Sequence, residues 1–290
     1  MTDRDTPAYE GRAYHRPDEN LFDQGLSFGL KTLVSRRRML GLAGAGAVAA
    51  AGLAVHGTGA AASPSASPPG TRVPEEIPEE MAGPYPGDGS NGPDILERSG
   101  VVRSDVRSSV QGGGVARGVP MTIEMTVYDM AAGNARFEGA AVYIWMCDKD
   151  GGYSMYTRGL EHETYLRGVQ IADADGTVAF TAVFPGCYPG RWPHVHFEVF
   201  PDAASIVDVD NVIATSQMAL PEDVCRTVYR QPGYERSAWT FPYVSLETDM
   251  VFRDDGAAHQ MAAVNGDPYG GYAATLPVGV DTGTPPGHPG

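Results

Sequence analysis

The segment Pro185-Gly-Cys-Tyr-Pro-Gly-Arg-Trp-Pro-His-Val-His-Phe197 brings a tyrosine, an arginine and two histidines close together in the chain. In a β-strand, side chains two residues apart point to the same face, so His194 and His196 can present two imidazoles to one metal ion. Tyr188 adds an anionic oxygen when it is deprotonated, and Arg191 adds a fixed positive charge. Imidazole nitrogen with phenolate oxygen suits ferric iron better than zinc. The alternative is two ordinary strand histidines, one bonded internally and one solvated.

The N-terminal region predicts an export signal. Ser35-Arg-Arg-Arg-Met-Leu-Gly41 opens an apolar run over residues 39–55, and the run ends near the small-residue site Ala60-Ala-Ala62. The adjacent arginines after Ser35 are typical of the twin-arginine type. We therefore expect residues 1–62 to be a signal with a polar leader, cleaved after Ala62. A membrane anchor fits less well, because the run is short and rich in Gly and Ala.

The acidic composition excludes some classes of partner. The chain has 290 residues and a formal net charge of −15, and residues 63–290 keep 14 basic and 30 acidic residues, a charge of −16. A polyanion such as nucleic acid or an anionic membrane would be repelled. The same charge is also typical of an ordinary secreted surface, so we expect neither nucleic acid nor, after signal cleavage, membrane as a partner.

The rest of the chain divides by composition into three parts. Residues 63–82 are rich in Ser, Pro and Glu and are predicted to form a linker. Residues 83–280 are long enough for one domain with a substantial core. Residues 281–290 form a tail rich in Gly and Pro.

Three cysteines, Cys147, Cys187 and Cys225, remain after the predicted signal. In an exported protein an odd count favours one disulfide and one free thiol, although the pairing cannot be assigned. Three buried reduced thiols are the alternative. A thiolate metal site is disfavoured, because no two cysteines have CxxC-like spacing.

Past Pro120 the chain is patterned as short strands between Gly, Asp and Pro turns. The expected strands are residues 121–128, 140–145, 178–184, 194–200, 212–218, 250–252, 260–264 and 272–280. Only residues 221–229, which begin Pro-Glu-Asp, indicate a helix. Many short strands with regular turns predict a mainly β fold, a β-sandwich or barrel.

Several ordered motifs resemble the intradiol ring-cleavage dioxygenases, the family of catechol, hydroxyquinol and protocatechuate dioxygenases. The resemblance covers most of residues 83–280 and implies a mixed β-sandwich with little helix. Its motifs, in addition to the opening segment, are Gly83-Pro-Tyr-Pro86, Arg103-Ser-Asp-Val106, Gly139-Ala-Ala-Val-Tyr-Ile-Trp145, Asp148-Lys-Asp-Gly-Gly-Tyr-Ser154, Arg167-Gly-Val-Gln170, Asp175-Gly-Thr-Val-Ala-Phe180, Thr215-Ser-Gln217 and Asp249-Met-Val-Phe252.

The resemblance implies a non-haem Fe(III) cofactor held by two tyrosines and two histidines. The family's first tyrosine follows eight residues after the tryptophan of the strand motif, which is Tyr153 counted from Trp145. The second tyrosine is Tyr188. By the same resemblance, the histidines are His194 and His196, with Tyr188 and His194 axial and the other two ligands equatorial.

The resemblance also implies three catalytic roles. Tyr188 would leave the metal and accept a substrate proton as an internal base. Arg191 would stabilise negative charge that develops on the substrate ring. Gln217 would orient Arg191 or iron-bound solvent. A surface salt bridge is the alternative for Arg191.

The expected function is an exported Fe(III) intradiol dioxygenase that cleaves a catecholic ring with O2 to a muconate-type diacid. The alternative is a secreted β-sandwich module that binds aromatics or polysaccharide and keeps a vestigial metal site. A cupin-type oxidase does not fit, because the expected downstream Glu and second His motifs are missing. Only Pro189 and Gly190 separate Tyr188 from Arg191, a shorter link than in well-known members of the family, so the choice of catechol stays open, as does the oligomeric state.

Overall fold

The computed structural model describes residues 8–9, 12–13 and 74–283. Two short strands, β1 (Ala8–Tyr9) and β2 (Arg12–Ala13), pair with each other and belong to a separate unit from the domain over Val73–Pro289. The predicted twin-arginine motif, the cleavage site after Ala62 and most of the tail lie outside the described residues. The division into signal, linker, domain and tail therefore stays a prediction. Within the described residues, no helix has the length and apolarity to cross a membrane.

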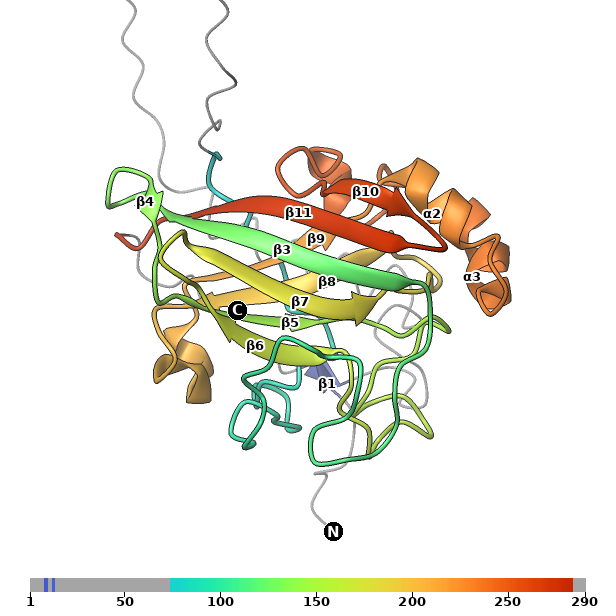
Figure 1. Cartoon of the computed structure of the whole chain (residues 1–290), viewed down its shortest axis with the longest axis horizontal. Helices are drawn as coiled ribbons and strands as arrows, with labels where there is room; N and C mark the ends of the chain where they lie inside the picture. The colour runs from blue at the N-terminus through green and yellow to red at the C-terminus, as the bar shows by residue number, and fades with distance from the viewer. Residues whose placement is uncertain (1–7, 10–11, 14–73, 284–290) are drawn as a thin grey trace, which may run out of the picture. The chain divides into compact units, whose positions relative to one another are not determined.

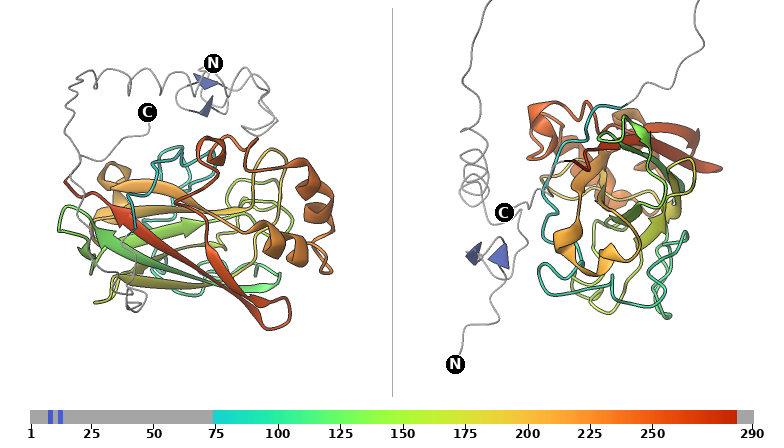
Figure 2. Two further views of the ribbon diagram at one scale, coloured as in Figure 1. Left: turned by 90° about the horizontal axis from the view of Figure 1, so that it is seen from above. Right: turned by 90° about the vertical axis from the view of Figure 1, so that its left-hand side faces the viewer.

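The domain consists of two stacked β-sheets, which confirms the predicted mainly β fold (Figures 1 and 2). In one sheet β3 pairs with β4, β7 and β11, and β11 pairs with β10. The β3–β11 pair is parallel and all other strand pairs are antiparallel, so the sandwich is mixed. The strands of this sheet are β3 (Pro120–Asp129), β4 (Ala135–Arg136), β7 (Thr177–Val183), β10 (Ala263–Asp267) and β11 (Gly271–Val280).

This larger sheet is buried on one face only. In β3 the side chains of Met121, Ile123, Met125 and Val127 are buried, and the residues between them are exposed or half-buried. Alternation of this kind places apolar side chains against the core and polar ones in water. The alternation of apolar and polar residues that predicted a strand at 121–128 thus also identifies the face that packs against the core.

The four-stranded sheet has the order β6-β5-β8-β9 and is buried on both faces. Every residue of β5, β8 and β9 is buried. One face packs on the larger sheet, while Tyr143 and Trp145 lie on the other face in a cluster with loop residues such as Ile95 and Tyr153. The strands are β5 (Ala141–Trp145), β6 (Arg167–Ile171), β8 (His194–Phe200) and β9 (Ala214–Ala219).

Helices are few and short. The predicted helix at 221–229 forms as α2 (Glu222–Val228), with acidic residues in its first turn. A second helix, α3 (Glu235–Thr240), was not predicted. The short 3₁₀ helices are η2 (Ser205–Val207), η3 (Val209–Asn211), η4 (Phe241–Tyr243) and η5 (Phe252–Asp254).

Two sequence predictions are wrong. Residues 250–252 form no strand, because the Asp249 carboxylate accepts the N–H groups of Val251 and Phe252 and turns the backbone into η5. No disulfide joins the cysteines either. Cys147, Cys187 and Cys225 are all free and buried, so the alternative of three reduced thiols holds.

The turn before β7 depends on a glycine. Gly176 has a φ of +69°, and a Cβ there would lie 2.6 Å from the Val127 carbonyl oxygen. Gly133 has a similar φ of +73° with open space around it. We expect Gly133→Ala to lower the free energy of unfolding by about 1–2 kcal/mol through the left-handed backbone alone. Gly176→Ala should lower it by a further ~1–3 kcal/mol through overpacking. Urea unfolding of both variants checks this, and equal losses would contradict the steric account.

Candidate metal centre

His194 and His196 begin β8 and point to the loop-covered face of the four-stranded sheet. His196 lies opposite Trp145 of β5 and opposite Gln217 of β9 in the strand register. Its ring stacks on the Trp145 indole, with centroids 4.7 Å apart and an interplanar angle of 7°. Because residues paired across antiparallel strands share a face, the register fixes these three side chains in one row.

Tyr153 is positioned by the turn that follows β5. The Asp148 Oδ1 atom accepts the backbone N–H groups of Asp150 and Gly152, and Asp148 N donates to the Gly152 carbonyl. Tyr153 N donates to Thr157 Oγ1 at 2.8 Å. This closed turn carries the Tyr153 ring, which is buried, back over the sheet.

Tyr188 is positioned by a close contact between two backbone segments. Gly186 N donates to the Asp148 carbonyl at 3.0 Å. A Cβ on Gly186 would lie 2.6 Å from the Lys149 carbonyl oxygen, so only glycine permits this approach. Cys187 N donates to Ser237 Oγ of α3 at 2.9 Å. The glycine in the P-G-x-Y motif therefore serves to bring the Tyr188 segment beside the turn that carries Tyr153.

Polar atoms of four side chains converge at this point. The Tyr153 and Tyr188 hydroxyls are 3.2 Å apart, and they lie 3.5 and 3.3 Å from Nε2 of His194. Nε2 of His194 lies 3.0 Å from Nε2 of His196. The structure thus brings together all four side chains that the sequence singled out as metal ligands.

Both imidazoles are held in the neutral form. His194 Nδ1 lies 2.5 Å from the Trp192 carbonyl oxygen, which can only accept, so Nδ1 carries the proton and Nε2 keeps its lone pair. Burial, reinforced by the Arg191 charge, lowers the pKa of His194 to about 3. Burial likewise lowers the pKa of His196 and raises the pKa values of Tyr153 and Tyr188.

This donor set fits a ferric ion. Two ligand atoms at about 2.1 Å from one metal are separated by roughly 3.0 Å at a right angle and roughly 3.4 Å at the tetrahedral angle. The separations of 3.0–3.5 Å between these atoms are close to those values. Two neutral imidazoles and two phenols would become a dianionic set by losing two protons, which suits a trivalent cation. Elsewhere in residues 74–283, no group of three or more His, Cys, Asp or Glu side chains could hold a metal.

Arg191 lies beside the four side chains and is buried, so the alternative of a surface salt bridge is wrong. Its Nε donates to Asp249 Oδ2 at 3.0 Å, and its Nη2 donates to Gln217 Oε1 at 2.5 Å. Both charged side chains are 0% exposed. Gln217 in turn donates from Nε2 to the Met81 carbonyl. The guanidinium is therefore fixed from two sides.

Asp249 is a site residue that the sequence reasoning missed. It accepts from Arg191, from Trp192 N at 2.6 Å, and from the N–H groups of Val251 and Phe252. Burial would raise its pKa, but the Arg191 charge and these donors lower it below the ordinary value. The motif Asp249-Met-Val-Phe252 was visible in the sequence, although nothing in it indicated an arginine partner 58 residues away.

Residues 80–87, which we call the covering segment, run over the site. A Cβ on Gly83 would lie 3.4 Å from His196 Cε1, and the Tyr85 ring centroid is 5.0 Å from that of Tyr153. Glu80 N donates to the Thr215 carbonyl. Burial raises the pKa of Glu80 to about 8, although the nearby Arg191 charge opposes the shift. The predicted linker therefore ends in ordered structure, because its last residues pack on the sheet.

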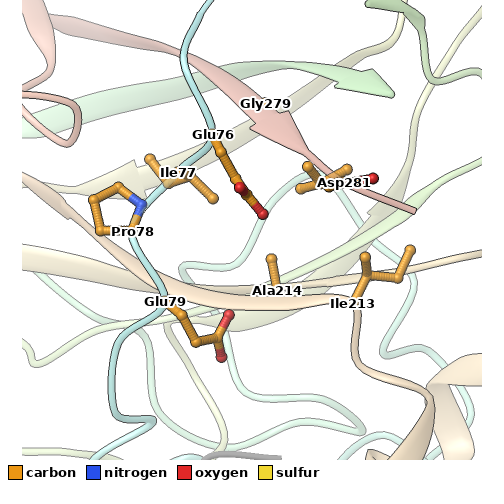
Figure 3. A pocket seen from close by; sticks show the side chains of 9 residues that line it. Glu76, Ile77, Pro78, Glu79, Ile213, Ala214, Gly279 and Asp281 are labelled. Carbon is orange, nitrogen blue, oxygen red and sulfur yellow. The ribbon is translucent and has the colours of Figure 1, made fainter. Parts of the chain in front are cut away.

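Other candidates lie apart from this cluster. His162 and His259 are exposed, and His288 lies outside the described residues. A pocket of about 300 Å³ near the start of the covering segment is lined by carboxylates and apolar side chains (Figure 3). Its lining residues are Glu76, Ile77, Pro78, Glu79, Ile213, Ala214, Gly279, Val280 and Asp281, and none of them belongs to the converging set.

Comparison with known proteins gives a consistent result. A family model described as dioxygenase matches residues 90–208. An intradiol ring-cleavage dioxygenase from Tetranychus urticae is 22% identical, with 71% of this chain and 95% of that chain covered and a TM-score of 0.56. A second dioxygenase structure is 23% identical, with coverage of 71% and 94% and a TM-score of 0.55. The dioxygenase domain of a carbohydrate-binding fusion protein from Streptomyces sp. SirexAA-E is 22% identical, with coverage of 71% and 99% and a TM-score of 0.46. No curated protein sequence matches this chain.

The Arg191–Asp249 pair predicts a large loss of stability when it is broken. Asp249→Ala leaves a buried guanidinium without its partner and should lower the free energy of unfolding by about 3–5 kcal/mol. Glu222→Ala removes an exposed pair with Arg226 and should lower it by about 0.5 kcal/mol or less. Urea denaturation measures both variants, and similar small losses would show that the buried pair is not important for stability.

Glu80 predicts a pH-dependent difference in stability. The folded state keeps the Glu80 proton up to about pH 8, while the unfolded chain loses it near the ordinary value of 4.5. The wild type should therefore lose stability relative to Glu80→Gln as pH rises from about 4.5 to 8, and the difference should level off above that. Melting temperatures from pH 4 to 9 test this, with Glu76→Gln as an exposed control on the adjoining chain. Parallel curves for wild type and Glu80→Gln would refute the assignment.

Proposed function

We propose that the chain is an intradiol ring-cleavage dioxygenase, a non-haem Fe(III) enzyme that opens a catecholic ring with O2. Its match to a dioxygenase family model over residues 90–208 and its fold support this proposal. The product would be a muconate-type diacid that contains both oxygen atoms. The observation that carries the proposal is the convergence of two phenol oxygens and two imidazole nitrogens at 3.0–3.5 Å. Tyr153, Tyr188, His194 and His196 would hold the iron. When bound, the ferric ion would supply Lewis acidity to the catechol oxygens and activate the ring toward O2.

Tyr188 is suited to accept a proton from the substrate. It is the one member of the converging set that is half-buried, whereas Tyr153 and both histidines are buried. The adjoining Pro189 and Gly190 are exposed, so a small molecule can approach from this side. Burial raises the pKa of Tyr188, and the Arg191 charge opposes that shift. In the phenolate form that a bound ferric ion would hold, the Tyr188 oxygen could accept the proton of a catechol hydroxyl that reaches the site.

Arg191 is suited to stabilise negative charge on the substrate. Asp249 and Gln217 fix its Nε and Nη2 atoms, so the cation does not need to reorganise during the reaction. A preorganised charge in a buried site acts more strongly than one in water. Gln217 would act through Arg191 by holding its orientation.

The short link between Tyr188 and Arg191 does not select one catechol as the substrate. Pro189 and Gly190 form an exposed turn in which the Arg191 N–H donates to the Tyr188 carbonyl. The charge of the chain and its predicted signal support the further proposal that the enzyme acts outside the cytoplasm after twin-arginine export.

The colour of the iron-loaded protein tests the proposed site. A tyrosinate–Fe(III) site should give a visible charge-transfer band that shifts when catechol is added without O2. Tyr153→Phe should weaken or shift this band and lower the turnover rate by more than the ~10–100-fold typical of residues that only contact a ligand. Tyr272→Phe, a buried tyrosine of β11 in the other sheet, is the matched control and should leave both unchanged.

Activity is measured as O2 uptake with catechol, hydroxyquinol and protocatechuate, and ring-opened products are identified by absorbance and mass. A protein that stays colourless after ferric loading would contradict the proposed cofactor. A coloured protein that takes up no O2 with any of the three substrates would contradict the proposed reaction.

A further inference from the structure

Arg167 of β6 is the centre of a second buried polar network beside the proposed iron site. Its side chain is among the largest fully buried ones, with 1% relative exposure. Nε donates to Ser154 Oγ at 3.0 Å, and Nη2 donates to the carbonyls of Ser154 at 2.9 Å and Tyr85 at 2.8 Å. Nη1 donates to the Pro86 carbonyl at 2.5 Å and to the Tyr143 hydroxyl at 3.0 Å. A guanidinium has five N–H donors, and here each of them has an acceptor.

These five acceptors come from three parts of the domain. Ser154 directly follows Tyr153, Tyr85 and Pro86 belong to the covering segment, and Tyr143 is in β5. In the strand register Arg167 lies opposite Trp145, which lies opposite His196. One planar group therefore ties the Tyr153 turn and the covering segment to the strand row that contains His196.

Burying the charge of Arg167 costs desolvation free energy. Within the described residues its five acceptors are all uncharged, and it forms no salt bridge within 4.0 Å. Moving a charged group out of water carries a penalty, and apolar replacements of buried charged groups are often neutral or stabilising. Stability alone therefore gives little reason for an arginine here. Geometry gives a reason, since only the guanidinium fork reaches all five acceptors at once.

The two segments that Arg167 joins meet at the site. The Tyr85 and Tyr153 ring centroids are 5.0 Å apart, and Gly83 packs on the His196 ring. A shift of the covering segment relative to the Tyr153 turn would move Tyr85 and Gly83 against a proposed iron ligand. Misplacement of reacting groups by about 1 Å can lower a rate about 100-fold.

We propose that Arg167 is a positioning residue that sets the Tyr153 phenol and the covering segment in one fixed arrangement around the substrate. It contacts neither the substrate nor the proposed iron, and it acts through Ser154, Tyr85 and Pro86. The proposal rests on the proposed function for its catalytic consequence, but the mechanical coupling of the two segments does not require iron.

The test variant is Arg167→Lys, which keeps the positive charge but replaces the planar guanidinium and its five N–H donors with an ammonium group. Arg103→Lys is the matched control. Arg103 also donates to backbone carbonyls, those of Arg167, Thr164 and Ser108, but it contacts no residue of the converging set. Iron-loaded Arg167→Lys should keep most of its iron, show a shifted charge-transfer band per iron, and have a kcat/KM lowered by about 10–100-fold with part of the loss in KM. Arg103→Lys should keep the wild-type band and KM.

Hydrogen–deuterium exchange of the iron-free protein gives a second readout. Arg167→Lys should speed exchange in peptides that cover residues 80–95 and 153–157 together, and Arg103→Lys should not. If Arg167→Lys folds poorly, Ser154→Ala removes the Nε acceptor, together with the hydroxyl's own bond to the Tyr165 carbonyl, and should produce a smaller effect in both segments. The proposal would be overturned if folded Arg167→Lys exchanged at the wild-type rate in both segments. It would also be overturned if Arg167→Lys and Arg103→Lys changed the exchange rates equally. A colourless or inactive wild type would instead refute the proposed function, and the exchange result would still decide whether Arg167 couples the segments.

Discussion

The strand register of the four-stranded sheet is the constraint on which the site depends. Arg167, Trp145, His196 and Gln217 stand opposite one another across β6, β5, β8 and β9. A slip of one residue between any two of these strands would turn a whole row of side chains to the other face. Both faces of this sheet are buried, so such a slip would also place each side chain in the packing environment of the opposite face. The register is therefore strongly specified. The position of each candidate ligand follows from that pairing.

The face of the sheet that carries the site combines a packed core with buried charge. Trp145, Tyr143 and Tyr153 pack with loop residues, while Arg191 and Arg167 lie among them. The two arginines are held differently, since Arg191 faces a carboxylate and Arg167 faces neutral oxygens. All five N–H donors of Arg167 have acceptors, and Nε and Nη2 of Arg191 bond side chains 58 and 26 residues away. The result is a polar interior that is rigid because its donors have few alternative partners.

Much of the fold and of the candidate metal site could be predicted from local sequence patterns. The alternation in residues 121–128, the His-x-His pair and the spacing from Trp145 to Tyr153 are all features of single segments or of matched motifs. The roles of Asp249 and Arg167 did not follow, because Asp249 bonds Arg191 and Trp192, 58 and 57 residues away, and Arg167 bonds the Tyr85 carbonyl, 82 residues away. No short sequence pattern encodes such contacts. The disulfide expectation failed for a related reason, since an odd cysteine count contains no information about how far apart the thiols lie or whether they are exposed.

The free cysteine beside Tyr188 gives the molecule an internal reporter. Cys187 stands between Gly186, which packs on the Lys149 backbone, and Tyr188, and its thiol is buried, with a pKa that burial raises to about 12. Such a thiol reacts only when its segment detaches from the sheet, so its rate of alkylation measures that local opening. Under the proposed function iron would bind Tyr188, the residue next to Cys187, and should slow that reaction in proportion to its occupancy. The packing that requires glycine at position 186 thus also protects the thiol beside Tyr188, and mass mapping distinguishes its alkylation from that of Cys147 and Cys225.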